Sequence, residues 1–134
     1  MLTITDPRNI VYLENEYDTA GRVIKQTQAD GGEFEFAYTL DGSGTITQTD
    51  VTNPRGVVRR VTFNGDGYDT SDLAALGTAL EQATTYTRLA GSQLVETETD
   101  ALGWVTRYAD DTDGNVTSVT RLHGTAEAVA TSFT

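Results

Sequence analysis

Hydrophobic and polar residues alternate along several short stretches of the chain. In 33–37, Phe34 and Phe36 share one side of an extended backbone, while Glu33, Glu35 and Ala37 share the other. The same period of two runs through 57–62 and 116–121. Alternation over about four to eight residues is typical of strands, because successive side chains of a strand point to opposite faces. The pattern therefore predicts β-strands, and the high use of threonine (24 residues) favours them further.

Turn signals separate these stretches at short intervals. Each combines an Asp or Asn, whose side chain accepts a hydrogen bond inside its own turn, with a Gly, which adopts positive φ without a Cβ clash. The pairs are Asp18 with Gly21, Asp30 with Gly32, Asp41 with Gly44, Asn53 with Gly56, Asn64 with Gly67, Asp100 with Gly103, and Asp111 with Gly114. Regular turns between short strands predict a chain of antiparallel β-hairpins.

One segment has helical spacing. Leu73, Leu76 and Leu80 stand at i, i+3 and i+7 behind Ser71 and Asp72, two residues that commonly cap helices. We therefore expect one short helix in 71–83, inside a stretch, 65–85, that fits the rest of the pattern poorly.

The chain repeats itself with a period of about 22 residues. Aromatic residues end successive predicted strands at steps of 21, 25, 23 and 22 residues, namely Tyr17, Tyr38, Phe63, Tyr86 and Tyr108. The turn residues Asp6, Asn53 and Asp100 recur at equal steps of 47 residues. Each unit runs from an aromatic residue through a Gly turn, a strand, a second turn and another strand to the next aromatic residue.

These residues resemble the Rhs/YD-repeat family, in which Tyr-Asp opens each unit, Gly-Arg follows, and a second Asp-x-x-Gly turn comes before the next Tyr. The resemblance covers residues 1–134 as one module of about five degenerate repeats, with 65–85 as an irregular insertion. Phe63 replaces Tyr, and Tyr38 lacks the following Asp. The signature positions are Tyr17, Asp18, Gly21, Arg22, Tyr38, Gly56, Phe63, Tyr86, Asp100, Gly103, Tyr108 and Gly114.

The resemblance implies an all-β fold in which repeated antiparallel hairpins form one curved, spiralling sheet. Members of the family are large proteins whose repeats enclose a toxic C-terminal domain in bacteria, or form a barrel in animal adhesion receptors. It implies flanking repeats and an enclosed effector domain as partners, a secreted or cell-surface location within a larger protein, and open sheet edges that self-associate. For Arg22 it leaves two interpretations: a brace for a neighbouring carboxylate or carbonyl, or a solvated side chain.

Composition narrows the function classes. Twenty acidic and nine basic residues give a formal charge of −11, which opposes binding to nucleic acid and to anionic membranes. No apolar run approaches the roughly 18 residues of a membrane-spanning helix, and the N-terminal residues do not form a signal peptide. Without a signal peptide, the chain is cytoplasmic, the mature form of an exported protein, or a piece of a larger one; the resemblance to the repeat family favours the piece. The absence of Cys excludes disulfides, thiolate metal sites and cysteine nucleophiles.

Candidate catalytic and metal-binding residues are few. His123 is the only histidine, and no nucleophile motif accompanies it. The carboxylates lie mostly in turns or on strand faces, where solvation accounts for them without a glycosidase pair. The sequence around Asp111 resembles part of a calcium loop, but Ala109 and Thr120 stand where carboxylate ligands are required. We expect no catalytic residue, no cofactor and no metal site.

Two functions fit these observations. The first is a non-catalytic structural segment of an Rhs/YD-repeat shell that encloses or presents an effector domain. The alternative is a carbohydrate- or surface-binding β module, in which Trp104, Tyr108 and Tyr12 form an aromatic platform for sugar rings. Tryptophan in a sheet more often packs across strands, which favours the first.

Overall fold

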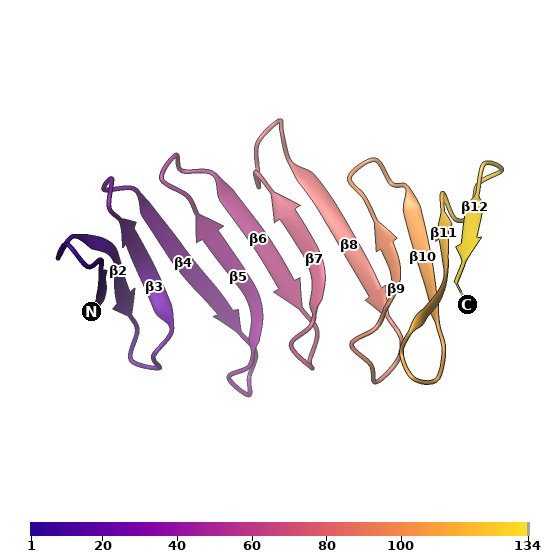
Figure 1. Ribbon diagram of the computed structural model, residues 1–134, viewed down its shortest axis with the longest axis horizontal. Helices are drawn as coiled ribbons and strands as arrows, with labels where there is room; N and C mark the ends of the chain where they lie inside the picture. Colours follow the sequence, from indigo (N-terminus) through magenta and orange to yellow (C-terminus); the bar gives the residue numbers. More distant parts are fainter. Residues whose placement is uncertain (134) are drawn as a thin grey trace.

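A computed structural model describes residues 1–133 as a single sheet of twelve antiparallel strands (Figure 1). The strand order follows the sequence from β1 to β12, and the two end strands lie far apart, so the sheet is not closed. The prediction of an all-β hairpin array is confirmed. The strands are β1 (Leu2–Thr5), β2 (Val11–Tyr17), β3 (Val23–Gln28), β4 (Glu33–Leu40), β5 (Ile46–Thr52), β6 (Val58–Phe63), β7 (Asp69–Ala74), β8 (Gln82–Arg88), β9 (Val95–Thr99), β10 (Val105–Asp110), β11 (Val116–Arg121) and β12 (Val129–Ser132).

Most turns close as their sequences predict, except that the turn between β3 and β4 has its positive φ at Gly31 and not at Gly32. In seven of them the side-chain Oδ1 of the first residue accepts hydrogen bonds from the backbone N–H groups two and four residues later; these residues are Asp6, Asp18, Asp41, Asn53, Asn64, Asp100 and Asp111. The fourth residue of each turn has a positive φ; Asn9 occupies this position in the first turn, and Gly occupies it in the other six. Because both features are local, each turn sequence specifies its own hairpin.

The two long edges of the sheet differ. Turns that follow even-numbered strands lie along what we call the lower edge, and turns that follow odd-numbered strands lie along the upper edge (Figure 1). The strand pairing shifts by one residue in all five lower-edge hairpins. Among the upper-edge hairpins only the β1–β2 pair has such a shift. Bulges bend strands and increase their right-handed twist, so their concentration at one edge favours a curved sheet.

Equivalent residues of successive hairpins are staggered. Tyr38 pairs with Thr49, and Thr49 pairs with Val61, which is two residues before Phe63. In the same way Val61 pairs with Asp72, and Asp72 pairs with Thr84, which is two residues before Tyr86. The offset is two residues for every two strands. With a rise of about 3.3 Å per residue and about 4.8 Å between strands, it tilts the strands by roughly 35° from the perpendicular to the long axis of the sheet. A constant stagger is the geometry of sheets that curl around an axis.

The short helix predicted for 71–83 is wrong. Residues 69–74 form β7, which pairs with β6 on one side and β8 on the other. Ala75 and Gly77 then adopt φ values of 54° and 73°, which no right-handed helix contains. The backbone hydrogen bonds of β7 to two neighbouring strands outweigh the weak helical signal of three leucines. The loop 75–81 is longer than the five-residue turns, and the chain continues in order into β8.

The sheet is one layer thick and has no core. No side chain among residues 1–133 is buried, and the accessible surface is 9003 Å². A compact monomer of this mass would expose about 6,800 Å². A single sheet has no second layer to cover either of its faces, so both faces are available for contact. Within the described residues there is no helix that is long and apolar enough to cross a membrane.

Candidate interaction surface

The strand aromatics gather on one face of the sheet, which we call the aromatic face. Phe34, Phe36 and Tyr38 alternate with charged and small residues along β4. The strand register places four further aromatic residues on the same face: Tyr17, Phe63, Tyr86 and Tyr108. The opposite face carries many threonines and ion pairs. Every predicted repeat aromatic therefore lies on one surface.

Tyrosine hydroxyls on this face bond within the sheet. The Tyr38 hydroxyl donates to the carbonyl oxygen of Val23 at 2.7 Å, and the Tyr108 hydroxyl donates to Glu98 Oε2 at 3.1 Å. Partial loss of hydration against the sheet raises the pKa of Tyr38, Tyr86 and Tyr108, and for Tyr108 the hydrogen bond to Glu98 raises the pKa further. These rings pack against the sheet while their polar ends find partners, as expected of tyrosine at a half-exposed surface.

Arg22 braces its own turn. Its Nε donates to Asp18 Oδ2 at 2.6 Å, and its guanidinium lies 5.3 Å from the centre of the Tyr38 ring. The first of the two interpretations of Arg22 is therefore correct. The contact joins the turn after β2 to the aromatic residue of β4, so two successive repeats are tied together at the lower edge.

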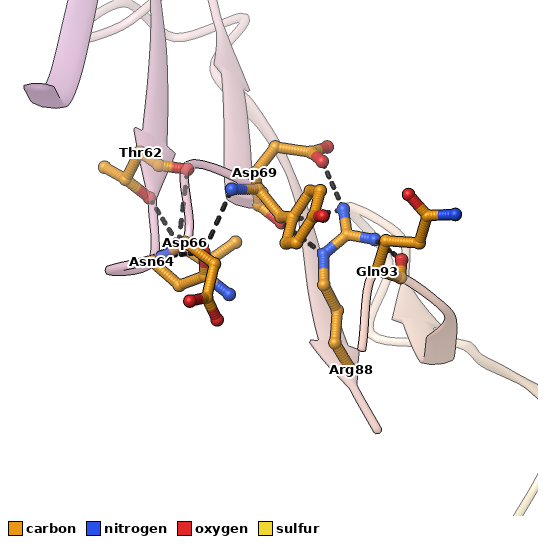
Figure 2. A network of polar contacts seen from close by, with 8 residues as sticks. Thr62, Asn64, Asp66, Asp69, Arg88 and Gln93 are labelled. Carbon is orange, nitrogen blue, oxygen red and sulfur yellow. Dashed lines mark hydrogen bonds and ion pairs between the residues drawn. The ribbon is translucent and has the colours of Figure 1, made fainter. Parts of the chain in front are cut away.

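A second arginine makes a similar contact that the sequence analysis missed. Arg88 donates to the carbonyl oxygen of Asp69 at 3.0 Å and to that of Gln93 at 2.5 Å, and it also contacts the Asp69 carboxylate. Figure 2 shows its guanidinium between these two residues. Its carbon Cζ lies 5.5 Å from the centre of the Tyr68 ring, and its side chain is only 12% exposed. Arg88 thus connects two neighbouring lower-edge turns. No sequence pattern around Arg88 predicts this contact, because its partner Asp69 lies 19 residues away.

The remaining signature residues act in turns. Gly56, Gly103 and Gly114 have φ values of 74°, 83° and 84°. Asp100 closes its turn by accepting the N–H groups of Leu102 and Trp104 at 2.9 Å. These residues shape the backbone of their turns.

The predicted three-residue sugar platform does not assemble. Trp104 closes an upper-edge turn and is 47% exposed, whereas Tyr108 lies toward the other end of β10. Tyr12 lies in β2, with seven strands between it and β10. At about 4.8 Å per strand the separation is close to 40 Å, so Tyr12 and Tyr108 cannot contact one sugar.

The other chemical candidates lie apart. His123 is exposed, and its backbone N–H donates to the carbonyl oxygen of Val105 at 2.8 Å. The Asp111 carboxylate accepts hydrogen bonds from Asp113 and Asn115 of its own turn. Across the part of the chain that the structure describes, no three His, Asp or Glu side chains are placed to hold a metal ion.

The turn carboxylates give the fold a defined pH dependence. Hydrogen bonds from the Ser43 hydroxyl and the Thr45 N–H hold the pKa of Asp41 below its usual value, and Asp6, Asp18 and Asp111 are shifted in the same direction by their turns. A carboxyl with a lowered folded pKa stabilises the fold above its unfolded pKa and loses this contribution as the pH falls. We expect the free energy of unfolding to decrease below about pH 4.

The variant D41N tests this dependence at one turn. Asn retains the Oδ1 acceptor, as Asn53 and Asn64 show in equivalent turns, but does not titrate. D41N should unfold at nearly the native urea concentration at neutral pH and lose less stability than the native chain between about pH 5 and pH 2. Equal acid sensitivity of the two proteins would contradict the assignment.

One hollow lies on the aromatic face, near the lower edge between β8 and β11. It has a volume of about 250 Å³ and is lined by Tyr86, Leu94, Val95, Glu98, Tyr108, Asp110, Gly114 and Val116. Two predicted repeat tyrosines thus meet here, together with carboxylates that the sequence analysis had not singled out.

No family model matches this chain, and no curated protein does. Several solved structures resemble it, including the following two. One, the crystal structure of TcdB2-TccC3-Cdc42, has a TM-score of 0.60 and 19% identity over 83% of this chain and 6% of that chain. The other, a Photorhabdus luminescens Tc holotoxin pore, has a TM-score of 0.62 and 19% identity over 84% of this chain and 5% of that chain. At this identity the likeness concerns the fold alone, and this chain matches only a small part of two much longer chains.

Proposed function

We propose that this chain is a non-catalytic wall segment of the Rhs/YD-repeat type, which contributes a stretch of curved sheet to a larger secreted assembly. In that assembly, one face of the sheet would contact an enclosed or presented effector domain. The resemblance of the sequence to the repeat family and the likeness of the fold to parts of Tc toxin chains support this proposal.

The observation that carries the proposal is the single-layer sheet without a buried side chain in residues 1–133. A protein that acts alone encloses a core and a defined site. Here the repeat aromatics, the turn caps and the Arg–Tyr contacts all maintain the shape and continuity of the sheet. A wall requires these properties, since each repeat of such an array uses its neighbours as packing partners.

The solution mass across a concentration series tests the proposal. Both end strands are exposed along their whole length, and unpaired strand edges attract other strands. We expect a mass that rises above 14.4 kDa with concentration. A 14.4 kDa monomer at every concentration, with slow amide exchange in all strands, would overturn the proposal, because such a sheet would need no neighbours.

A proline variant shows whether the β12 edge mediates this association. The Phe133 N–H donates a hydrogen bond to the Thr117 carbonyl oxygen of β11. In an antiparallel strand, the N–H groups of every second residue point toward the same neighbouring strand, and those of the residues in between point away from it. The N–H of Ala130 therefore points away from β11. A130P removes an outward donor and leaves the β11–β12 ladder intact, so it should reduce association. T131P breaks that ladder and serves as the control for unfolding of the strand.

A further inference from the structure

The hollow on the aromatic face has a composition that the repeat does not explain. Glu98 lies directly opposite Tyr86 in the β8–β9 pair. The corresponding residue opposite Tyr38 is Thr49, and the one opposite Tyr108 is Val119. The tyrosines belong to the repeat. A carboxylate also lies opposite Phe63, but that residue, Asp69, pairs with Arg88, whereas no ion pair of Glu98 is present among the described residues. Glu98 accepts the Tyr108 hydroxyl through Oε2, but this contact needs only an acceptor and does not account for a charged residue.

The walls of the hollow combine three kinds of surface. The tyrosines 86 and 108 supply aromatic rings, and Leu94, Val95 and Val116 supply aliphatic groups. Glu98 and Asp110 supply two carboxylates, and no basic side chain lines the hollow. Arg121, whose charge lowers the pKa of Tyr108, lies outside it on β11.

We propose that this hollow binds a lysine or arginine side chain from a polypeptide that lies across the aromatic face. An apolar stem would pack against the aliphatic groups and rings, and the cationic end would bond to Glu98 and lie against the tyrosine faces. A volume of about 250 Å³ accommodates one such side chain. The identity of the partner as an enclosed polypeptide rests on the proposed function, whereas the recognition of a cation rests on the hollow alone.

The test is a titration of the intact chain, labelled with ¹⁵N, with acetyl-arginine-amide and with its neutral isostere acetyl-citrulline-amide. We expect millimolar binding of the arginine compound, with shifts confined to amides around Val95, Glu98, Gly114 and Val116, and binding of the citrulline compound weaker by at least about fivefold. Equal binding of both compounds, or no shifts at about 50 mM arginine compound, would overturn the proposal.

Two variants with the same charge change locate the site. E98Q keeps an acceptor for the Tyr108 hydroxyl but removes the charge, and should weaken arginine binding by about fivefold or more. E96Q changes a residue of the same strand that pairs with Arg107 and does not line the hollow, so its affinity should stay within about twofold of native. Equal weakening in both variants would mean general attraction to an acidic protein. If the chain associates through its edges but does not bind arginine, this inference fails while the proposed function stands.

Discussion

Replacing Arg88 with Met is expected to lower the free energy of unfolding by about 2–3 kcal/mol. The guanidinium donates to the carbonyl oxygens of Asp69 and Gln93 and pairs with the Asp69 carboxylate. Hydrogen bonds from a charged donor in a site that is only 12% exposed are among the stronger ones in proteins. Met retains much of the apolar stem, so the loss reports on the polar contacts and on the Tyr68 ring contact. Urea denaturation measures the change.

The matched control is Arg107→Met. Arg107 is half exposed, and its contact with Glu96 is long, at 3.6 Å, so its loss should cost less than about 0.5 kcal/mol. Hydrogen exchange adds a local measurement: in R88M, protection should fall first at the Leu89 and Ser92 amides of the adjoining turn. A change in stability no larger than that of R107M would show that the Arg88 contacts are not formed in solution.

Replacing Gly44 with Val is expected to cost about 2 kcal/mol, mainly through backbone strain. Gly44 has a φ of 88°, and an added Cβ would meet no atom within 4 Å. The Cβ position therefore lies in open space, and the left-handed backbone is the main obstacle to the substitution. Because the same turn recurs along the chain, the result applies to Gly21, Gly56 and Gly103 as well.

Gly42 provides the control in the same turn. It has no positive φ, and it also has open space around its Cβ position, so G42V should change the free energy of unfolding by less than about 0.5 kcal/mol. G44N should fall between the two, because Asn9 adopts a φ of 62° at the equivalent position of the first turn. Urea midpoints in the order native, G44N, G44V support the strain argument, whereas equal loss in G42V and G44V contradicts it.

Much of the fold could be predicted from the sequence because its determinants are local. Asp41 and Gly44 close a turn within five residues, and the alternation of Phe34, Phe36 and Tyr38 fixes which face of β4 is apolar. The helix prediction failed where local signals were weak. The spacing of three leucines favoured a helix, but β7 forms backbone hydrogen bonds to β6 and β8, and a leucine pattern cannot reveal these partners.

The interaction surface was only partly predictable. The repeat pattern identified Tyr86 and Tyr108 as strand-ending aromatics, but it did not show that Glu98 and Asp110 line the same hollow. The contact of Arg88 with Asp69 spans 19 residues, and it depends on the strand pairing in two hairpins. Arg59 and Asp72 meet on the aromatic face for the same reason, 13 residues apart. These pairs follow from register, which no single repeat specifies.

The sequence by itself determined the class of this protein: short strands, capped glycine turns, a period of about 22 residues, and one aromatic side per hairpin. Each of these depends on interactions within a few residues, such as the Asp18 carboxylate with its own turn. Only the tertiary structure decided that no side chain of the described residues is buried, that bulges concentrate at the lower edge of the sheet, and which charges meet on the aromatic face. The physical reason is that register and stagger accumulate from strand to strand, so they exist only once all the strands are paired.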